Sequence, residues 1–386
     1  MTGHADFDRL IGDDRRFRAD WLTWTVLALA LLTVIGLVWL WPDPTEQLPT
    51  SPEFALEVVT GRVQSARDGS CSFASDLSCH RVVFEITSGR DAGSITSQEF
   101  EISTSAPRFT EGEAVVLNMV DTEDPRLRYQ WSDRDRRPVL WALGAVFALA
   151  VVGLGRLRGL AALGGLAASV GLLVVFIAPA ILSGSNPVLV AAVGGSAIAL
   201  VALYLAHGWS PLTHVAAIGT FSALALTLVL SAMVANLARF SGFGSEEALF
   251  LAFVDGLQIQ GLILAGAVLG AIGALDDVTV TQASTVFELH SVNPDVDRRR
   301  LFQSGLKVGR DHIASTVNTL LLAYAGASMP LLLLFTLSEM RLDFIANSEV
   351  VAVEIFRTLV GSIGLVASVP LTTWLAAAVV TRSSPR

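Results

Sequence analysis

Charged and amide side chains stand inside otherwise apolar segments at two places in this chain. The first group is Asp255 with Gln258, in FVDGLQIQG, and Glu354 with Arg357, in VEIFRTLVG. Glu354 and Arg357 are three residues apart, so they share one face of a helix. Asp255 lies roughly 9 Å inside the end of its apolar run at 1.5 Å of rise per residue. The group predicts a substrate or proton site, or else a structural ion pair that locks two helices.

The second group surrounds two adjacent carboxylates, Asp276 and Asp277, in GALDDVTVTQAS. Hydroxyl and amide side chains follow them, and Thr281 shares the helical face of Asp277. In the next apolar segment Asp311 and Asn318 recur on one stripe, and Pro interrupts that segment. Oxygen donors at this density suit hard cations, and broken helices are found near transport sites. The alternative is a solvated loop in which the carboxylates only favour the start of a helix.

Standard catalytic constellations are missing from the sequence. The six histidines show no HExxH or other metal-ligand spacing, and GALDD lacks the Gly-x-Gly-Asp motif of intramembrane aspartyl proteases. No Gly-rich loop ending in Gly-Lys is present to bind nucleotide phosphates. We therefore predict no enzymatic activity and no cofactor, and we leave open whether the chain binds a metal.

The elements that must position these groups are expected to be membrane-spanning helices. Hydrophobic residues make up 52% of the 386 residues and charged residues 16%, and the mean hydropathy is +0.59. Soluble domains carry about 25% charged residues, so most of the apolar excess must face a lipid bilayer. The net charge of −9 leaves no basic face for nucleic acid.

Eight apolar runs predict eight spans. They lie near 21–41, 138–155, 159–183, 187–207, 212–237, 249–274, 312–337 and 350–380. The arginine-rich turns all fall on one side if both termini are cytoplasmic, as the positive-inside rule requires. We interpret residues 1–20 as a cytoplasmic segment, 21–41 as an anchor, and 138–386 as a helical membrane domain with a cytoplasmic loop at 276–311. A cleaved signal peptide is the alternative for the first run, which is long and has no small-x-small site after it.

Residues 42–137 predict a small all-β domain outside the cytoplasm. Five short β-type runs, separated by Gly, Ser, Asp and Pro, suggest an OB-like barrel or a compact sandwich. Both cysteines of the chain, Cys71 and Cys79, lie in this segment and could close the tip of a hairpin as a disulfide. The segment holds 17 acidic and 10 basic residues, so it carries most of the negative charge.

The segment GAVLGAIGALDDVTVTQASTVFELH resembles the YibE/F family of bacterial polytopic membrane proteins. The order of elements agrees: an anchor, a β-rich segment that opens with TGRVQSA, the sequence DRDRRPVLWAL leading into the next span, and then a helical domain. Members of the family more often have a single Asp before the Val, which Asp277 matches and to which Asp276 is an addition. The resemblance implies the bacterial inner membrane as the location and does not imply a substrate.

Three functions remain open at this point. The leading hypothesis is a transporter or permease-like protein that moves a small ion or solute between the two polar layers. The second is an envelope assembly protein that docks a partner protein through residues 42–137. The third is a membrane-bound enzyme that acts on lipid-linked substrates, and it has the least support because no pair of nucleophile and base is visible.

Overall fold

The structure is a computed structural model that describes residues 20–42, 57–74, 76–104, 106–120, 122, 128–254, 256–337 and 340–382. The chain divides into two compact units: Pro49–Ala150 forms one, and Met1–Leu48 together with Val151–Arg386 forms the other. The first contains the strands, and the second contains nearly all of the helices.

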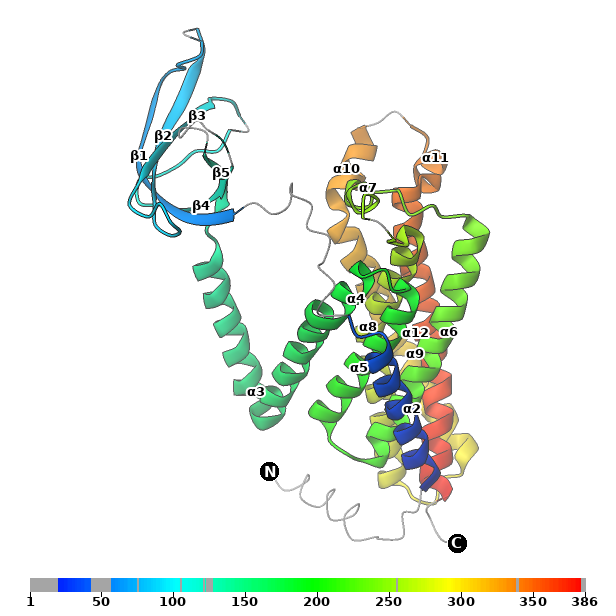
Figure 1. The fold of residues 1–386 in the computed structure, drawn as a ribbon. Coiled ribbons are helices and arrows are strands. Elements are labelled where there is room, and N and C mark those ends of the chain that lie inside the picture. The colour runs from blue at the N-terminus through cyan, green and yellow to red at the C-terminus, as the bar shows by residue number, and fades with distance from the viewer. Residues whose placement is uncertain are drawn as a thin grey trace. The chain divides into compact units, whose positions relative to one another are not determined.

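The strands form one five-stranded antiparallel sheet that curls into a half-barrel (Figure 1). They are β1 (Glu57–Ser70), β2 (Ser78–Ile86), β3 (Ile95–Glu101), β4 (Ala114–Met119) and β5 (Tyr129–Arg134), in the spatial order β3-β2-β1-β4-β5. The five β-type runs expected from the sequence are therefore confirmed as strands. Between the two outer strands the Gln98 amide donates to the Tyr129 carbonyl at 3.1 Å and accepts from the Trp131 N–H at 2.9 Å. One side chain thus bridges β3 and β5.

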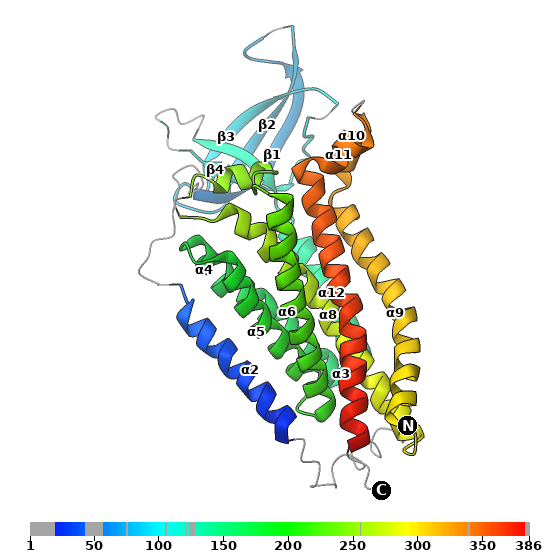
Figure 2. The ribbon, with the colours of Figure 1, turned by 90° about the vertical axis from the view of Figure 1, so that its right-hand side faces the viewer.

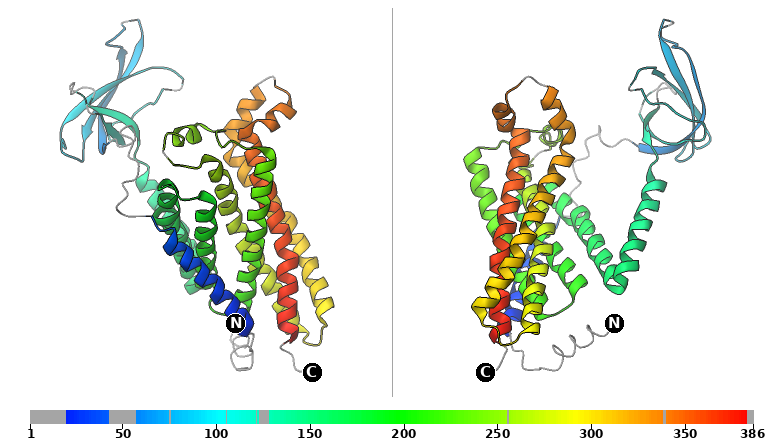
Figure 3. Two further views of the ribbon diagram at one scale, coloured as in Figure 1. Left: turned by 45° about the vertical axis from the view of Figure 1, so that its right-hand side comes forward. Right: turned by 180° about the vertical axis from the view of Figure 1, so that it is seen from behind.

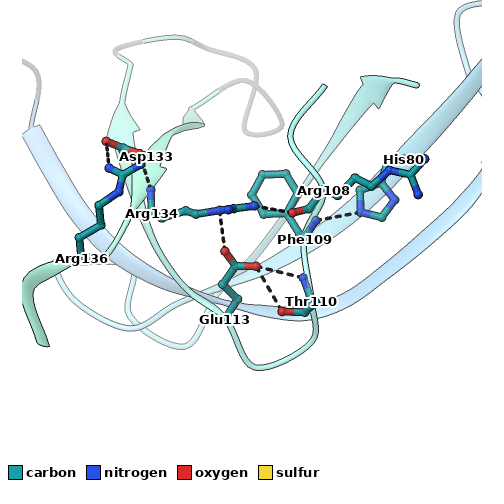
Figure 4. Close-up of polar contacts among 8 residues, drawn as sticks. All are labelled: His80, Arg108, Phe109, Thr110, Glu113, Asp133, Arg134 and Arg136. Carbon is teal, nitrogen blue, oxygen red and sulfur yellow. Dashed lines mark hydrogen bonds and ion pairs between the residues drawn. The ribbon is translucent and has the colours of Figure 1, made fainter. Parts of the chain in front are cut away.

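The core of the half-barrel is apolar and aromatic. Phe84 and Leu117 are fully buried in it, and Phe109, in the connection between β3 and β4, is 5% exposed. Figure 4 shows how polar contacts hold that connection: the Phe109 N–H donates to Nε2 of His80 at 3.3 Å, and Glu113 accepts from the Thr110 N–H at 3.0 Å. The backbone around Phe109 is fixed from both sides, which holds its ring in the core.

The two cysteines are joined. Cys71 and Cys79 form a disulfide with their Cα atoms 4.9 Å apart, so that part of the prediction is confirmed. The bridge closes the tip of the β1–β2 hairpin, where Phe73 is 67% exposed. Beside the bridge, the Glu99 carboxylate accepts from both the backbone N–H and the hydroxyl of Ser72, at 2.8 and 2.7 Å.

We expect the β-unit to lose stability in acid through Glu99. Hydrogen bonds from Ser72, and then from Arg81, lower the pKa of this carboxyl from 4.5 to about 2. A lowered folded-state pKa contributes stability that is complete above the unfolded-state pKa and is lost as the pH falls through the folded-state value. Between about pH 4.5 and 2, Glu99→Gln should therefore reduce the fall in unfolding free energy. Chemical unfolding at several pH values measures this dependence of the unfolding free energy on pH, with Glu101→Gln on the same strand as the control. If the unfolding free energy fell equally steeply with pH in both variants, the prediction would be wrong.

The helices of the second unit run side by side as a bundle (Figure 2). Six helical stretches are long and apolar enough to cross a membrane: Trp21–Trp39, Arg137–Leu182, Pro187–His207, Pro211–Ala238, Ile259–Val292 and Glu349–Thr381. A seventh is reached if the pair Arg298–Ala327 and Met329–Leu337, bent by 66°, counts as one span. The elements are α2 (Asp20–Trp39), α3 (Arg137–Leu172), a π-helical turn (Leu173–Ile177), α4 (Ala178–Leu182), α5 (Pro187–His207), α6 (Pro211–Ala238), α7 (Glu246–Leu251), α8 (Ile259–Val292), α9 (Arg298–Ala327), α10 (Met329–Leu337), α11 (Leu342–Asn347) and α12 (Glu349–Arg382).

This count differs from the eight spans expected from the sequence, because the second and third predicted spans form one helical stretch. That stretch is broken at Arg156, whose φ of 53° and ψ of −129° are not helical. The backbone approaches itself there, since a Cβ on Gly159 would collide with the carbonyl of Val151. The break falls at the Arg-rich turn that the sequence places between two spans.

Two further segments differ from the sequence expectation. The predicted span at 249–274 is interrupted between Leu251, where α7 ends, and Ile259, where α8 begins. Residues 276–311, expected as a cytoplasmic loop that contains an amphipathic helix after Asp277, are almost entirely helical: α8 continues without a break to Val292 and α9 begins at Arg298. The hydroxyl-rich sequence after Asp277 keeps helical periodicity, and one of its faces packs in the bundle. For this reason α8 continues past the carboxylates.

Helix α8 lies at the centre of the bundle and packs against α5, α6, α9 and α12. Seen from behind, α9 runs alongside α12 (Figure 3, right). Small residues make these contacts close: a Cβ on Gly305 of α9 would lie 2.9 Å from side-chain methyl groups of both Val286 and Thr373. Glycine permits this separation because it has no side chain to displace.

Candidate functional site

The Asp276 and Asp277 pair lies in the middle of α8, a 34-residue helix. The pair is therefore not at a helix start, and the helix dipole does not account for it. Asp276 is partly buried, and its Oδ1 atom has no hydrogen-bond partner among the described residues. The Asp277 side chain is exposed, with 69% of its surface accessible to solvent. Two carboxylates are thus held in mid-helix without a stabilising helix terminus.

A pocket of about 600 Å³ opens beside this pair, between α3, α5 and α8. Its polar lining consists of Asp276, Asp277 and Thr281 from α8, His207 from α5 and Ser169 from α3. Among the residues that the structure describes, no Lys or Arg lines it. Three of the residues singled out in the sequence therefore meet in one cavity, and its charged lining is acidic.

Hydroxyl groups of α6 and α8 lie behind Asp276. The Oγ1 atoms of Thr220 and Thr279 are 2.7 Å apart, and the Thr279 hydroxyl donates to the Asp276 carbonyl at 3.1 Å. Both threonines are completely buried. The backbone carbonyl of Asp276 is thus connected to polar groups inside the bundle.

The residues of α9 that the sequence associates with this site are placed differently. Asp311 and Asn318 are exposed, and no described hydrogen bond or ion pair joins either of them to Asp276 or Asp277. The contact across to α9 comes from His312, whose Nε2 lies 3.9 Å from Asp277 Oδ2. The predicted stripe faces outward because the neighbouring positions, Gly305 and Gly309, turn the opposite face of α9 toward α8 and α12.

The other polar group centres on Glu354 and Arg357 of α12. The Arg357 Nη1 atom donates to Glu354 Oε1 at 2.6 Å, and each side chain is 28% exposed. Arg357 also packs on α8, since a Cβ on Gly266 would lie 3.3 Å from its Nη2 atom. Its Nε–H is buried and has no hydrogen-bond partner in the described part of the chain. Both members of the ion pair lie on α12, and Arg357 is the one that packs against α8.

This pair lines a second pocket, of about 980 Å³, at the break between α9 and α10. The break occurs at Ser328, two residues before Pro330, whose ring and missing N–H interrupt a helix. The other charged lining residues are glutamates: Glu246, Glu247 and Glu349. Glu349 accepts from the Ser241 hydroxyl and the Gly242 N–H, at 2.7 and 2.6 Å, so it fixes the chain that follows α6.

The two remaining candidates have different outcomes. Asp255 lies outside the described residues, so its place in a cluster with Glu354 and Arg357 stays a prediction. Gln258 forms the N-cap position of α8 and accepts from the Asn186 side chain at 3.3 Å. Asn186 caps α5, so this contact ties the starts of two helices together.

The sequence indicated Gln282 only as one of the polar side chains that follow Asp277, and it did not single out Thr220 or Thr372. Gln282 is 2% exposed, and its Nε2 donates to the Gly305 carbonyl at 2.8 Å and to the Thr373 hydroxyl at 2.7 Å. Thr220 and Thr372 are fully buried, and the Thr372 hydroxyl has no partner among the described residues. Their signal in the sequence is weak, since hydroxyl residues in apolar helices commonly bond to their own backbone. Within the described ranges, no group of three or more His, Cys, Asp or Glu residues is arranged to hold a metal ion.

Comparison with known proteins gives one match. A family model described as YibE/F-like protein matches residues 143–382, which is more than half of the chain. No curated protein and no solved structure matches. The matched range begins within α3 and contains both pockets described above.

Proposed function

Because the chain belongs to the YibE/F-like family and places two carboxylates in the middle of an apolar helix, we propose that it is a transporter or permease-like protein. It moves a small ion or solute across a bacterial inner membrane. The observation that carries the proposal is the pocket lined by Asp276, Asp277 and Thr281. Carboxylates within a span are costly and are retained where they bind or relay something.

The proposed arrangement has eight crossings, with both termini in the cytoplasm and the OB-like β-domain outside. At 1.5 Å per residue the 46-residue stretch Arg137–Leu182 would be about 70 Å long, against a bilayer core of roughly 30 Å. The break at Arg156 divides it into two crossings, and the bent α9–α10 pair supplies another. Arg156 and Arg158 at the break, and Arg298 to Arg300 at the start of α9, then lie on the cytoplasmic side, as the positive-inside rule requires.

The two pockets support a path with two polar layers. The pocket with Glu354 and Arg357 adjoins the broken helix and the N-terminal half of α8, and the pocket with Asp276 and Asp277 adjoins the middle of α8. Broken helices whose freed backbone lines a cavity recur at transport sites. The Glu354–Arg357 pair serves in this proposal as the contact that holds α12 against α8 during a transport cycle.

We expect Asp276→Asn to lower flux by about tenfold or more. A hydrogen bond between the transported ion or solute and a charged carboxylate contributes about 1.5–3 kcal/mol to binding, and about 1.4 kcal/mol corresponds to a factor of ten. The purified chain in lipid vesicles is assayed with a panel of protons, Na⁺, K⁺ and Mg²⁺. Glu288→Gln is the matched control, since Glu288 is exposed on the same helix and does not line the pocket.

Unchanged flux in Asp276→Asn and Asp277→Asn, with folding preserved, would rule out the transport proposal. The envelope-assembly alternative would then gain support if Phe73→Ala, at the exposed tip of the β1–β2 hairpin, abolished a cellular phenotype. An isolated exposed aromatic side chain on a stapled hairpin is the kind of anchor that partner proteins bind.

A further inference from the structure

A basic face lies along the first four turns of α9. Its members are the exposed side chains Arg299, Arg300, Lys307 and Arg310. Successive residues of an α-helix are about 100° apart, so these four fall within a sector of about 100° around the helix axis. The residues that bury α9 in the bundle, Leu301, Gly305 and Gly309, lie on the opposite side. The basic face therefore points away from the bundle, and α9 lies at the edge of the bundle in Figure 2.

The charge of this face is not neutralised by the rest of the described chain. Arg299, Lys307 and Arg310 form no ion pair with any described residue, and the Arg300 Nε atom lies 3.6 Å from Asp297 Oδ2 with its side chain 81% exposed. Asp297 is already engaged as the N-cap of α9, where it accepts from two backbone N–H groups at 2.8 and 3.1 Å. Residues 295–311 hold five basic and three acidic side chains, in a chain with a net charge of −9. The face is therefore complementary to an anion from outside the described chain.

Two markers place this face at the boundary between the hydrocarbon core of a bilayer and its headgroups. Residues 312–337, which follow the face in α9 and α10, contain no charged side chain. At 1.5 Å of rise per residue, Arg310 lies about 3 Å and Lys307 about 8 Å before that stretch. The second marker is Trp374 of α12, which is 56% exposed, since tryptophan gathers at membrane–water interfaces.

Trp374 lies at nearly the same level of the bundle as Lys307. Its neighbour Thr373 is 2.9 Å from a Cβ placed on Gly305, which is two residues from Lys307. The Arg298 guanidinium also lies over the Trp374 ring, 4.9 Å from the centroid. A bilayer is about 30 Å thick in its hydrocarbon core and about 40–45 Å with its headgroups, which leaves roughly 5–8 Å for each headgroup layer. Lys307 and Arg310 are thus at the depth of lipid phosphate groups.

We propose that the basic face of α9 binds the phosphate group of an anionic phospholipid. Lys307 and Arg310 are three residues apart, so they are neighbours on the helix surface and contact one headgroup together. Their apolar stems lie against the bilayer while the charged ends reach the phosphate. Leu321 and Leu322, which are 50% and 61% exposed further along α9, contact the acyl chains. The cytoplasmic leaflet follows from the arrangement of spans proposed above, and in that respect the proposal rests on the proposed function; the binding itself does not require transport.

The chain has a single lysine, Lys307, and this makes the site observable. Reductive methylation with isotope-labelled formaldehyde keeps the positive charge of Lys307 and gives it one side-chain NMR signal, apart from that of the N-terminal amine. The full chain is placed in nanodiscs of zwitterionic phosphatidylcholine with an increasing fraction of phosphatidylglycerol. The Lys307 signal should shift and then saturate. Arg310→Gln should lower the apparent affinity for phosphatidylglycerol about fivefold, which is the effect of one basic side chain near an anionic membrane surface.

The matched control is Arg239→Gln, because Arg239 is an exposed arginine at the end of α6 and is not part of the basic face. It should leave the titration unchanged. Lys307→Gln removes the NMR signal, so native mass spectrometry measures its effect, and it should retain fewer phosphatidylglycerol molecules than Arg239→Gln. The melting temperature of Arg310→Gln should equal that of the wild type, since Arg310 is exposed, and this separates loss of binding from misfolding.

Three results would overturn the proposal. The first is a titration that Arg310→Gln and Arg239→Gln change equally. The second is a shift that grows with the fraction of phosphatidylglycerol without saturating, which a uniform surface potential would produce. The third is the same saturating shift on addition of inorganic phosphate to nanodiscs of phosphatidylcholine alone.

The outcome is separable from that of the flux experiment. A saturating shift that depends on Arg310, in a chain that transports nothing in vesicles, would preserve the lipid-binding face and remove the transport function. Flux that depends on Asp276, without a response of Lys307 to phosphatidylglycerol, would do the reverse.

Discussion

Phe109→Ala is expected to lower the free energy of unfolding of the β-unit by about 3–5 kcal/mol. The ring is 5% exposed and lies against three other aromatic rings, with centroid distances of 5.6 Å to Phe84, 5.2 Å to Phe100 and 5.3 Å to Trp131. Truncation would remove all of these contacts at once. It would also leave a cavity in the apolar core of the half-barrel.

Two polar side chains that pack on the Phe109 ring add to the expected loss of unfolding free energy. The guanidinium of Arg134 lies 5.9 Å from the ring centroid, and the His80 ring stacks on it at 6.2 Å. His80 in turn contacts Asp68 Oδ1 through Nδ1 at 2.6 Å. Since Nε2 accepts the Phe109 N–H, the ring hydrogen is on Nδ1, which then donates to Asp68. Loss of the Phe109 ring would therefore free both polar groups that pack on it.

Chemical unfolding of the purified chain, followed by near-UV circular dichroism, measures the change. Phe73→Ala is the matched control in the same unit, because Phe73 is 67% exposed and its truncation should change stability by no more than about 0.5 kcal/mol. Domains are stable by about 5–15 kcal/mol, so a loss of about 3–5 kcal/mol would be a substantial part of that stability. Equal effects of the two substitutions would mean that the half-barrel does not depend on this ring.

Gly309→Val is expected to destabilise the helical unit by about 3 kcal/mol or more. A Cβ on Gly309 would lie 2.5 Å from a methyl of Val369 and 2.7 Å from Oε1 of Gln282. Valine adds two further methyl groups at the same point. Because Val369 and Gln282 are buried in the bundle, neither can move aside without leaving a cavity.

Gly309→Val is also expected to disturb the hydrogen bonds of the buried Gln282 amide. Gln282 joins α8 to α9 through the Gly305 carbonyl and to α12 through the Thr373 hydroxyl. If α9 moves outward to accommodate the new side chain, the first of these bonds breaks, and a buried polar group without a partner costs about 1–3 kcal/mol. The melting temperature of the full chain in detergent measures the loss.

Gly326→Val is the control on the same helix. Apart from the adjoining turns of its own helix, no atom of the described residues lies within 4 Å of a Cβ placed there, and valine is more favourable than glycine inside a helix. We expect its melting temperature to equal or exceed that of the wild type. A comparable drop in both variants would show that α9 responds to valine itself and not to its contact with α8 and α12.

Much of the fold could be predicted because its signals are local. Alternation and turn residues located the five strands, and the two cysteines, only eight residues apart, left one pairing to test. Apolar runs located the helices, with ends that agree closely for α5 and α6. The breaks were harder to predict. The interruption between Leu251 and Ile259 and the merging of two spans across Arg156 depend on how the backbone packs, and neighbouring residues in the sequence do not determine that.

The site was predicted less completely. Helical spacing correctly paired Glu354 with Arg357, because three residues along a helix fix their separation. The same logic put Asp311 and Asn318 on one stripe but could not say where the stripe points, and the two side chains are exposed, with no described hydrogen bond or ion pair to Asp277. Thr220 could not be associated with Thr279, because 59 residues separate them and many hydroxyl residues in apolar helices bond only to their own backbone.

The sequence by itself determined that this chain has apolar helices of membrane length, a small stapled β-unit, and a few carboxylates within the helical part. Composition and periodicity are properties of single segments, so they can be read without knowing which segments meet. Only the tertiary structure decided that Asp276 and Thr281 line the same pocket and that the Thr279 hydroxyl of α8 meets the Thr220 hydroxyl of α6. It also decided that Gln282 bonds to α9 and α12. A helix face limits the directions in which its residues point, but the neighbour that fills each direction is chosen by packing of the whole bundle.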